Sequence, residues 1–233
     1  MTARSPQRTN SLIRIVTLVS LLLVGCFSLG FTVFALDLLS SARAYITGES
    51  LWSSGQQDAV YHLERYAQTG TPEHLERARA SLAIPLGDMR GRLALDEDPP
   101  DLKTAREGLL QGGNHADDIP SLIRGYRYFG TAPYIRDAIA IWVETDRYIL
   151  AIGRVADALE QELGYGQPRR GVIDRLRLEL AQWNKEVRPL AAAFTRTLTA
   201  GSRWLFRVLI VLSTIVIVLV LLIVSGVFRW APT

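Results

Sequence analysis

The sequence predicts an all-α membrane protein in which two transmembrane helices flank an extracytoplasmic helical bundle. Three observations predict this fold: two long runs without a charged residue, helical spacing of the apolar residues between them, and weak signals for β-strands. No Asn-Gly or Asp-Gly pair separates two alternating runs in the 233 residues, so no β-hairpin is expected. We therefore expect a chain that crosses the bilayer twice and folds as helices on one side of it.

The two uncharged runs are long enough to cross a membrane. Residues 15–36 give a run of 22 and residues 208–228 a run of 21. A helix rises about 1.5 Å per residue, so each run spans the roughly 30 Å hydrocarbon core. Residues 1–14 carry three arginines and no acid. Because basic flanks resist translocation, we expect residues 1–14 and 229–233 in the cytoplasm, residues 37–207 outside, and a bacterial inner membrane as the location.

The only cysteine, Cys26, lies in the first uncharged run. The stretch Leu23–Cys26 resembles a bacterial lipobox, so a cleaved lipoprotein is an alternative. The residues after Cys26 stay apolar up to Leu36, whereas a lipoprotein would turn polar there, and an uncleaved anchor is the prediction. The outer segment then has no disulfide and depends on apolar burial.

The charge balance excludes a nucleic-acid partner. The whole chain has a formal net charge of +3, but all 23 acids and 22 of the 26 basic residues lie in residues 37–207, which gives that segment a charge of −1. A segment without excess positive charge does not attract a polyanion.

The first helix is expected to continue outward from residues 15–36 to about Thr69. Gly70-Thr71-Pro72 then predicts a helix end, an N-cap threonine and a proline at the first position of the next helix. Shorter helices are expected near residues 72–96, 101–111 and 115–128. The outer part of the first helix carries a face of apolar residues at helical spacing: Trp52, Ala59, Leu63 and Tyr66.

Two longer helices are expected near residues 132–163 and 170–229. Apolar residues recur along both at alternating intervals of three and four, the pattern of bundle helices. Between them, Gly164 is expected to end one helix in the left-handed conformation, and Pro168 allows the chain to turn back as an antiparallel hairpin. The two stripes include Ala138, Trp142, Ile149, Ile152, Leu159, Ile173, Leu180, Val187 and Phe194.

Three stretches carry a resemblance to a known family: Ala42–Ala59, Ile84–Asp88 and Gln111–Ile119. Together they resemble the periplasmic input domain at the N-terminus of bacterial signalling proteins. In those proteins the domain lies between two membrane helices, and the cytoplasmic part is a diguanylate cyclase, a cyclic-di-GMP phosphodiesterase or a histidine kinase. The resemblance covers roughly residues 40–205 and implies a sensory input module for an unknown small extracytoplasmic ligand.

No output activity follows from this resemblance. The sequence to Thr233 contains no Gly-Gly-Asp/Glu-Glu-Phe cyclase signature and no phosphoacceptor-histidine segment. The chain is expected to be either a stand-alone input subunit, coupled to a cytoplasmic or membrane signalling partner, or the input half of a longer protein. A homodimer is expected because paired helices signal across a two-fold axis.

The densest polar cluster is Gly112–Asp118, in which Asn114 and His115 are candidate ligand-binding residues. The structural alternative is a C-cap glycine followed by an Asn114 N-cap with acids in the first turn. No second histidine or cysteine lies at ligand spacing, so no metal site is expected.

The remaining candidate ligand-binding residues are basic and aromatic. Arg43 and Trp52 on the outer part of the first helix are candidates for an anion-accepting pocket, and Trp142 and Trp183 are expected to meet across the hairpin. Surface pairing and core packing are the respective structural alternatives. Two further candidates, in a basic aromatic turn suited to a carboxylate, are Arg124 and Arg127.

Neither a catalytic residue nor a cofactor is expected. The chain has three histidines, one cysteine in an apolar run, no Gly-x-Ser-x-Gly, no phosphate loop and no His-Glu-x-x-His. The predicted function is therefore sensing and signalling without catalysis. The alternative is a two-span structural or interaction protein that scaffolds or regulates a membrane complex.

Overall fold

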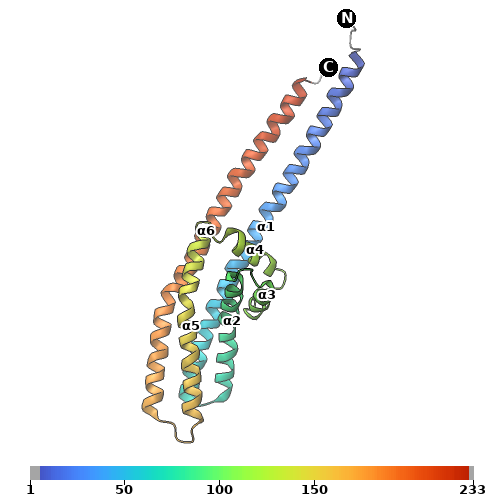
Figure 1. Ribbon diagram of the computed structural model, residues 1–233. Helices are drawn as coiled ribbons and strands as arrows, with labels where there is room; N and C mark the ends of the chain where they lie inside the picture. Colours follow the sequence, from blue (N-terminus) through green and yellow to red (C-terminus); the bar gives the residue numbers. More distant parts are fainter. Residues whose placement is uncertain (1–5, 231–233) are drawn as a thin grey trace. The chain divides into compact units, whose positions relative to one another are not determined.

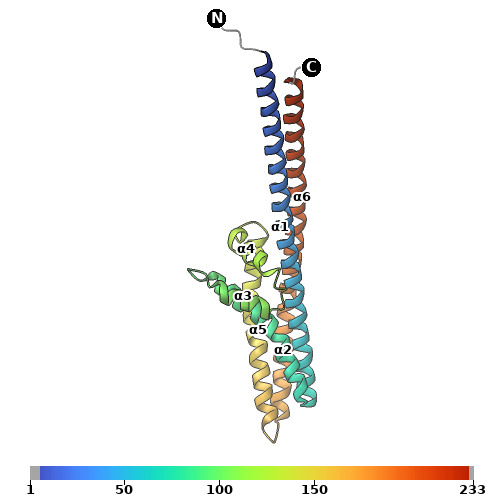
Figure 2. The same cartoon turned by 90° about the vertical axis from the view of Figure 1, so that its right-hand side faces the viewer.

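The computed structural model describes residues 6–230 and the exposure of side chains from residue 15 to residue 225. Figures 1 and 2 show α1, α2, α5 and α6 running alongside one another in the bundle, with α3 and α4 beside them. The predicted all-α fold is confirmed for this described part, whose helices are α1 Pro6–Thr69, α2 Pro72–Asp96, α3 Leu102–Gln111, α4 Ile119–Phe129, α5 Ile135–Gly164 and α6 Arg170–Trp230.

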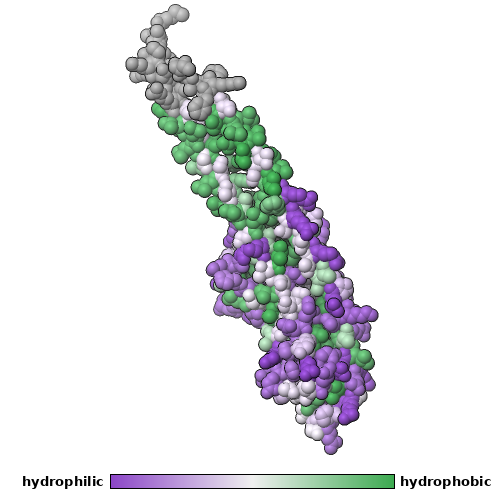
Figure 3. All heavy atoms as spheres, turned by 180° about the vertical axis from the view of Figure 1, so that it is seen from behind, coloured by the Kyte–Doolittle hydropathy of each residue, from purple (hydrophilic) through white to green (hydrophobic). Residues whose placement is uncertain are grey.

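The chain divides into two compact units. The segments up to Leu39 and from Arg203 form one unit, and Ser40–Ser202 form the other. Helices α1 and α6 each contain a stretch long and apolar enough to cross a membrane. Large apolar side chains there face outward: Leu22 and Leu29 are each 67% exposed. Figure 3 shows apolar residues gathered over this unit and polar residues over much of the bundle. Such a surface suits lipid rather than water.

The side chains of the predicted cytoplasmic ends, residues 1–14 and 229–233, lie outside the described part of the chain.

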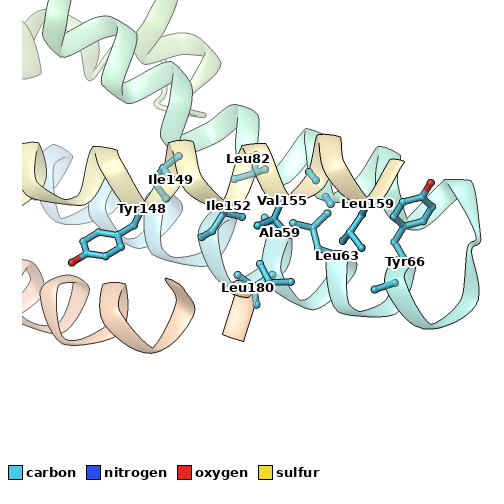
Figure 4. Packing of buried hydrophobic residues seen from close by; sticks show 14 of the residues in the cluster. Ala59, Leu63, Tyr66, Leu82, Tyr148, Ile149, Ile152, Val155, Leu159 and Leu180 are labelled. Atoms are coloured by element: carbon cyan, nitrogen blue, oxygen red, sulfur yellow. The ribbon is translucent and has the colours of Figure 1, made fainter. Parts of the chain in front are cut away.

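The main core of the bundle is apolar and comes from α1, α2, α5 and α6. The inner stripes predicted from the sequence supply it, and Figure 4 shows their side chains interdigitating. Each buried aliphatic or aromatic side chain contributes about 1.5–3 kcal/mol of transfer free energy. The core includes Trp52, Ala59, Leu63, Tyr66, Leu75, Leu82, Ile149, Ile152, Val155, Leu159, Ile173, Leu180 and Val187.

Helices α2 and α3 approach each other closely through glycines. A Cβ at Gly108 of α3 would lie 2.5 Å from the backbone nitrogen of Gly91 and 2.7 Å from the carbonyl oxygen of Gly87, both on α2. Only residues without side chains permit such an approach. This contact holds α3 against the α2 segment from which Asp88 and Arg92 project.

The turn between α5 and α6 differs from the prediction. Gly164 does not adopt a positive φ; it is the last residue of α5, and Tyr165 continues in an extended conformation (φ −73°, ψ 126°). The turn is held instead by Glu162, whose Oε1 accepts hydrogen bonds from the backbone nitrogen (2.6 Å) and Nε (3.0 Å) of Arg169. Because this carboxylate bridges the two helix ends, the left-handed glycine cap is not required. The antiparallel hairpin itself forms as expected.

Helix α4 begins four residues later than predicted, at Ile119 instead of residue 115. Residues 115–118 form a turn in which the Asp118 nitrogen donates to the His115 carbonyl oxygen at 2.9 Å. Pro120 lies in the first turn of α4, where its missing N–H costs nothing. Gly112 is the C-cap of α3, as predicted, but Asp118 and not Asn114 is the N-cap of α4.

Candidate functional site

All six helices contribute to one cavity within Ser40–Ser202. Its volume is about 40 Å³, which holds roughly two or three water molecules. The wall combines aromatic rings, aliphatic side chains, two carboxylates and one guanidinium. The lining residues are Tyr45, Gly48, Glu49, Trp52, Asp88, Arg92, Leu95, Leu109, Asn114, Leu122, Tyr126, Trp142 and Phe194.

A buried carboxyl group, Asp88, forms part of the cavity wall. Its residue is 4% exposed, and Oδ1 accepts a hydrogen bond from Asn114 Nδ2 at 2.9 Å. Asn114 Nδ2 also donates to the Leu109 carbonyl oxygen at 3.0 Å. A Cβ at Gly112 would overlap Asp88 Oδ1, so this packing requires glycine. Burial raises the pKa of Asp88 well above its ordinary value, opposed only by the Asn114 hydrogen bond.

The single basic group in the wall, Arg92, is 3% exposed and already paired. Its Nη2 contacts Asp146 Oδ2, and Nη1 donates to Asp96 Oδ2 at 3.4 Å. Its Cζ lies 5.6 Å from the centroid of the Trp142 ring. Desolvation raises the pKa of Asp146 and the Arg92 charge opposes that rise. Arg92 is thus paired with these acids, and in the described part of the chain neither Asp88 nor Glu49 forms an ion pair with a basic side chain.

Two N–H groups at the cavity have no hydrogen-bond partner. They are Arg92 Nε and Trp142 Nε1, the only side-chain atoms with this status among the described buried groups. The Trp142 ring stacks on Phe194 with centroids 6.3 Å apart, which holds the indole in place. A buried donor without an acceptor costs about 1–3 kcal/mol. An acceptor entering the cavity would recover that free energy.

The second carboxylate, Glu49 on α1, is 7% exposed. Its Oε1 accepts a hydrogen bond from Thr195 Oγ1 on α6 at 2.7 Å. This bond joins, inside the bundle, the two helices that contain the apolar spans. Tyr45 on α1 is likewise tied across the bundle, because its hydroxyl donates to the Leu122 carbonyl oxygen of α4 at 2.9 Å.

Three of the eight residues singled out in the sequence line the cavity: Trp52, Asn114 and Trp142. Of the other five, Arg43 is exposed and forms an ion pair with Asp118 at 2.5 Å, and the His115 side chain is 73% exposed.

The last three candidates also lie outside the cavity lining. Arg124 donates to Ser121 Oγ at 3.1 Å, within α4. Arg127 lies over the Tyr128 ring, with its Cζ 5.7 Å from the centroid.

The expected meeting of Trp142 and Trp183 is wrong. Trp183 packs edge-on against Tyr148 with ring centroids 6.0 Å apart, and its Nε1 donates to Glu179 Oε1 at 3.1 Å. Trp142 faces Phe194 instead. In an antiparallel hairpin, residues pair when they are equally distant from the turn, and these tryptophans are not.

Reasoning from the sequence did not select Arg92 or Asp88, which line the cavity, or Asp146, which pairs with Arg92. A signal for the first was present, because Arg92 continues the buried face of α2 in phase with Leu82 and Leu95. Charged residues in phase with a core stripe indicate a built polar site more often than a solvated surface.

Replacing Asp88 by asparagine is expected to raise the free energy of unfolding at pH 7 by about 0.5–2 kcal/mol, the common range for removing an unfavourable native feature. The folded pKa is raised, so the native state binds the proton more tightly and the ionised form destabilises it. Asparagine keeps the acceptor for Asn114. The gain is expected to vanish near about pH 3, where aspartate is protonated in both states.

Denaturation of the intact chain in detergent at both pH values measures this effect. The control is Asp157→Asn, whose carboxylate is 65% exposed and which should change the free energy of unfolding by less than about 0.5 kcal/mol. Destabilisation by D88N at pH 7 would show that the buried carboxylate is not a source of strain.

The comparisons with known proteins add no relative: no protein-family model matches the chain, and no curated protein or solved structure matches it. In the described part of the chain, no group of three or more His, Cys, Asp or Glu side chains is placed to hold a metal ion. Function therefore has to be inferred from the chemistry of the cavity.

Proposed function

We propose that the chain is a membrane-anchored sensory input module that detects a small extracytoplasmic molecule in the six-helix cavity. It passes the signal through its transmembrane helices to a cytoplasmic output, such as a cyclic-di-GMP enzyme or a histidine kinase. The observation that carries this proposal is a buried cavity with unpaired hydrogen-bond donors and two carboxyl groups without a basic partner, lined by both helices that contain the apolar spans. Buried polar groups of this kind destabilise a bundle unless a ligand uses them.

The size of the cavity supports signalling. Ligand sites for larger organic molecules have volumes of about 300–1,000 Å³, far above the 40 Å³ found here. A ligand larger than a few water molecules therefore has to displace lining helices when it enters. Glu49 and Trp52 lie on α1 and Phe194 lies on α6, so these two helices move with the wall. Binding then favours a second packing of the bundle, as a bistable switch requires.

The proposed arrangement places the bundle in the periplasm and both termini in the cytoplasm. Residues 1–14 contain three arginines and no acidic residue, and this composition supports the orientation through the positive-inside rule. We propose a homodimer in the bacterial inner membrane, in which a displacement of α1 and α6 changes the contact between two copies. The role assigned to the chain is binding without catalysis.

Distance measurements between spin labels on the intact chain in lipid nanodiscs test this proposal. Cys26 is replaced by serine, and labelled cysteines are placed at Ser54 on α1 and Ala192 on α6, which are both exposed. Amino acids, carboxylates, polyamines and aromatic compounds are first screened for thermal stabilisation. A stabilising compound is expected to shift the distance between these labels. The control pair, Gln68 and Arg175, lies near the other end of the bundle and should not shift.

Two outcomes would overturn the proposal. One is the absence of any stabilising compound together with a protein that co-purifies stoichiometrically, which would support the structural or interaction role. The other is a stabilising compound that leaves both label distances unchanged, because a binding protein that does not move cannot transmit. A reporter fused near Gln167 that proves cytoplasmic would exclude the orientation.

A further inference from the structure

The acidic side of the cavity selects for a positive charge. Glu49 and Asp88 are buried, and no basic side chain in the described part of the chain forms an ion pair with either. The one guanidinium in the wall, Arg92, is already occupied by Asp146 and Asp96. An ammonium group has three donors and one positive charge, and so supplies what both carboxylates lack.

The aromatic part of the wall favours the same group. Tyr45, Trp52, Tyr126 and Trp142 line the cavity with the two carboxylates. The faces of aromatic rings attract a desolvated ammonium group electrostatically. The two tyrosine hydroxyls do not compete with an ammonium group for Glu49 and Asp88, because their protons are already donated elsewhere. The Tyr45 hydroxyl donates to the Leu122 carbonyl oxygen, and the Tyr126 hydroxyl donates to Asp96 Oδ1 at 2.6 Å.

The donor side of the cavity selects for an acceptor. Arg92 Nε and Trp142 Nε1 are buried in residues that are 3% and 9% exposed, and both lack a partner. The two side chains are neighbours, because the guanidinium lies over the Trp142 ring with its Cζ 5.6 Å from the centroid. A carboxylate has two oxygens and is the acceptor best matched to two N–H donors of which one is charged.

We infer that the cavity recognises a small zwitterion that carries an ammonium group and a carboxylate, the chemistry of a small amino acid. The ammonium lies toward Asp88 and Glu49, and the carboxylate accepts from Arg92 Nε and Trp142 Nε1. The aliphatic remainder packs against Leu95, Leu109 and Leu122. The resting volume of about 40 Å³ favours a short side chain, because each further atom requires a larger displacement of the lining helices. This inference rests on the proposed sensory function and names its ligand class.

Three probes that differ by one group each test the inference on the intact chain in nanodiscs. Alanine carries both groups, ethylammonium lacks the carboxylate and propionate lacks the ammonium. Calorimetric titration is expected to give alanine at least a tenfold higher affinity than either fragment, because each charged contact that is lost costs about 1.4 kcal/mol or more.

Two variants assign each half of the ligand to its side of the cavity. Asp88→Asn is expected to weaken alanine and ethylammonium binding at least tenfold and to leave propionate unchanged. Trp142→Phe keeps an aromatic ring but removes Nε1–H, and is expected to weaken alanine and propionate at least threefold while sparing ethylammonium. The matched controls, Asp157→Asn and Trp183→Phe, alter an exposed carboxylate and a tryptophan outside the lining, and should change no affinity.

The outcomes separate the ligand class from the sensory role. Equal affinities for alanine, ethylammonium and propionate, or no binding of any of them, would overturn the zwitterion inference. If another compound then shifts the Ser54–Ala192 label distance, the sensory function stands with a different ligand. If alanine binds as expected and this distance does not change, the recognition chemistry stands and signalling through α1 and α6 fails.

Discussion

Replacing Leu63 by alanine is expected to lower the free energy of unfolding of the bundle by about 3–5 kcal/mol, in the upper part of the range for buried Leu→Ala changes. Leu63 is fully buried on α1 and lies among side chains of α1 and α5, including Ala59 and Leu159 (Figure 4). The cost is large where neighbours cannot collapse into the cavity left behind. Here α1 ends at Thr69, the nitrogen of Gly70 donates to the Tyr66 carbonyl oxygen at 2.8 Å, and α2 begins at Pro72.

Denaturation of the intact chain in detergent, followed by tryptophan fluorescence, measures this loss. The matched control is Leu178→Ala on α6, because Leu178 is 73% exposed and its truncation should cost less than about 0.5 kcal/mol. Similar losses for both variants would mean that the α1–α5 contact is not the centre of the core.

The helices were predictable from the sequence because each carries two independent signals. In α5, the apolar stripe through Trp142, Ile149 and Leu159 agrees with the burial of all three residues. At the α1–α2 junction, Gly70 and Pro72 predicted the break, and Gly70 has a φ of 67°. Periodicity and capping both depend on neighbours in sequence, so a single chain contains enough information to find them.

The cavity was only partly predictable, because it depends on which residues of different helices lie at the same height along the bundle axis. Trp142 was correctly placed on the inner face of α5, but its partner is set by the length of the α5–α6 turn. That turn is closed by Glu162 and Arg169, a contact between side chain and backbone that leaves no periodic signal. Asp88 lies in one of the stretches that carried the family resemblance, yet its burial follows from Gly112, which arrives from another helix.

Replacing Arg92 by methionine is expected to lower the free energy of unfolding by about 3 kcal/mol, at the low end of the range for removing one partner of a buried ion pair. The low end applies because the Asp146 side chain keeps 20% of its surface exposed and Asp96 keeps 48%. Methionine retains the packing of the arginine stem, so the loss reports the charge. The control is Arg90→Met, whose exposed pair with Glu107 should contribute less than about 1 kcal/mol.

The pH dependence of this variant identifies the cause of the loss. Without Arg92, only desolvation acts on Asp146, so its folded pKa lies further above the unfolded value than in the parent chain. A raised carboxyl pKa destabilises the fold above that pKa and has no effect once both states are protonated. The deficit of R92M relative to the parent should therefore shrink as the pH falls from 7 through the folded pKa of Asp146.

A double variant tests whether Arg92 stabilises the fold through Asp146. Arg92→Met combined with Asp146→Leu removes both charges, and replacement of a buried pair by apolar residues is often close to neutral. We therefore expect it to recover most of the stability that R92M loses, measured by the same denaturation. Additive losses in the double variant would mean that Arg92 acts through its contact with the Trp142 ring, at 5.6 Å, and not through Asp146. In that case the Arg92 guanidinium would not be neutralised, and the cavity would attract anions instead of an ammonium group.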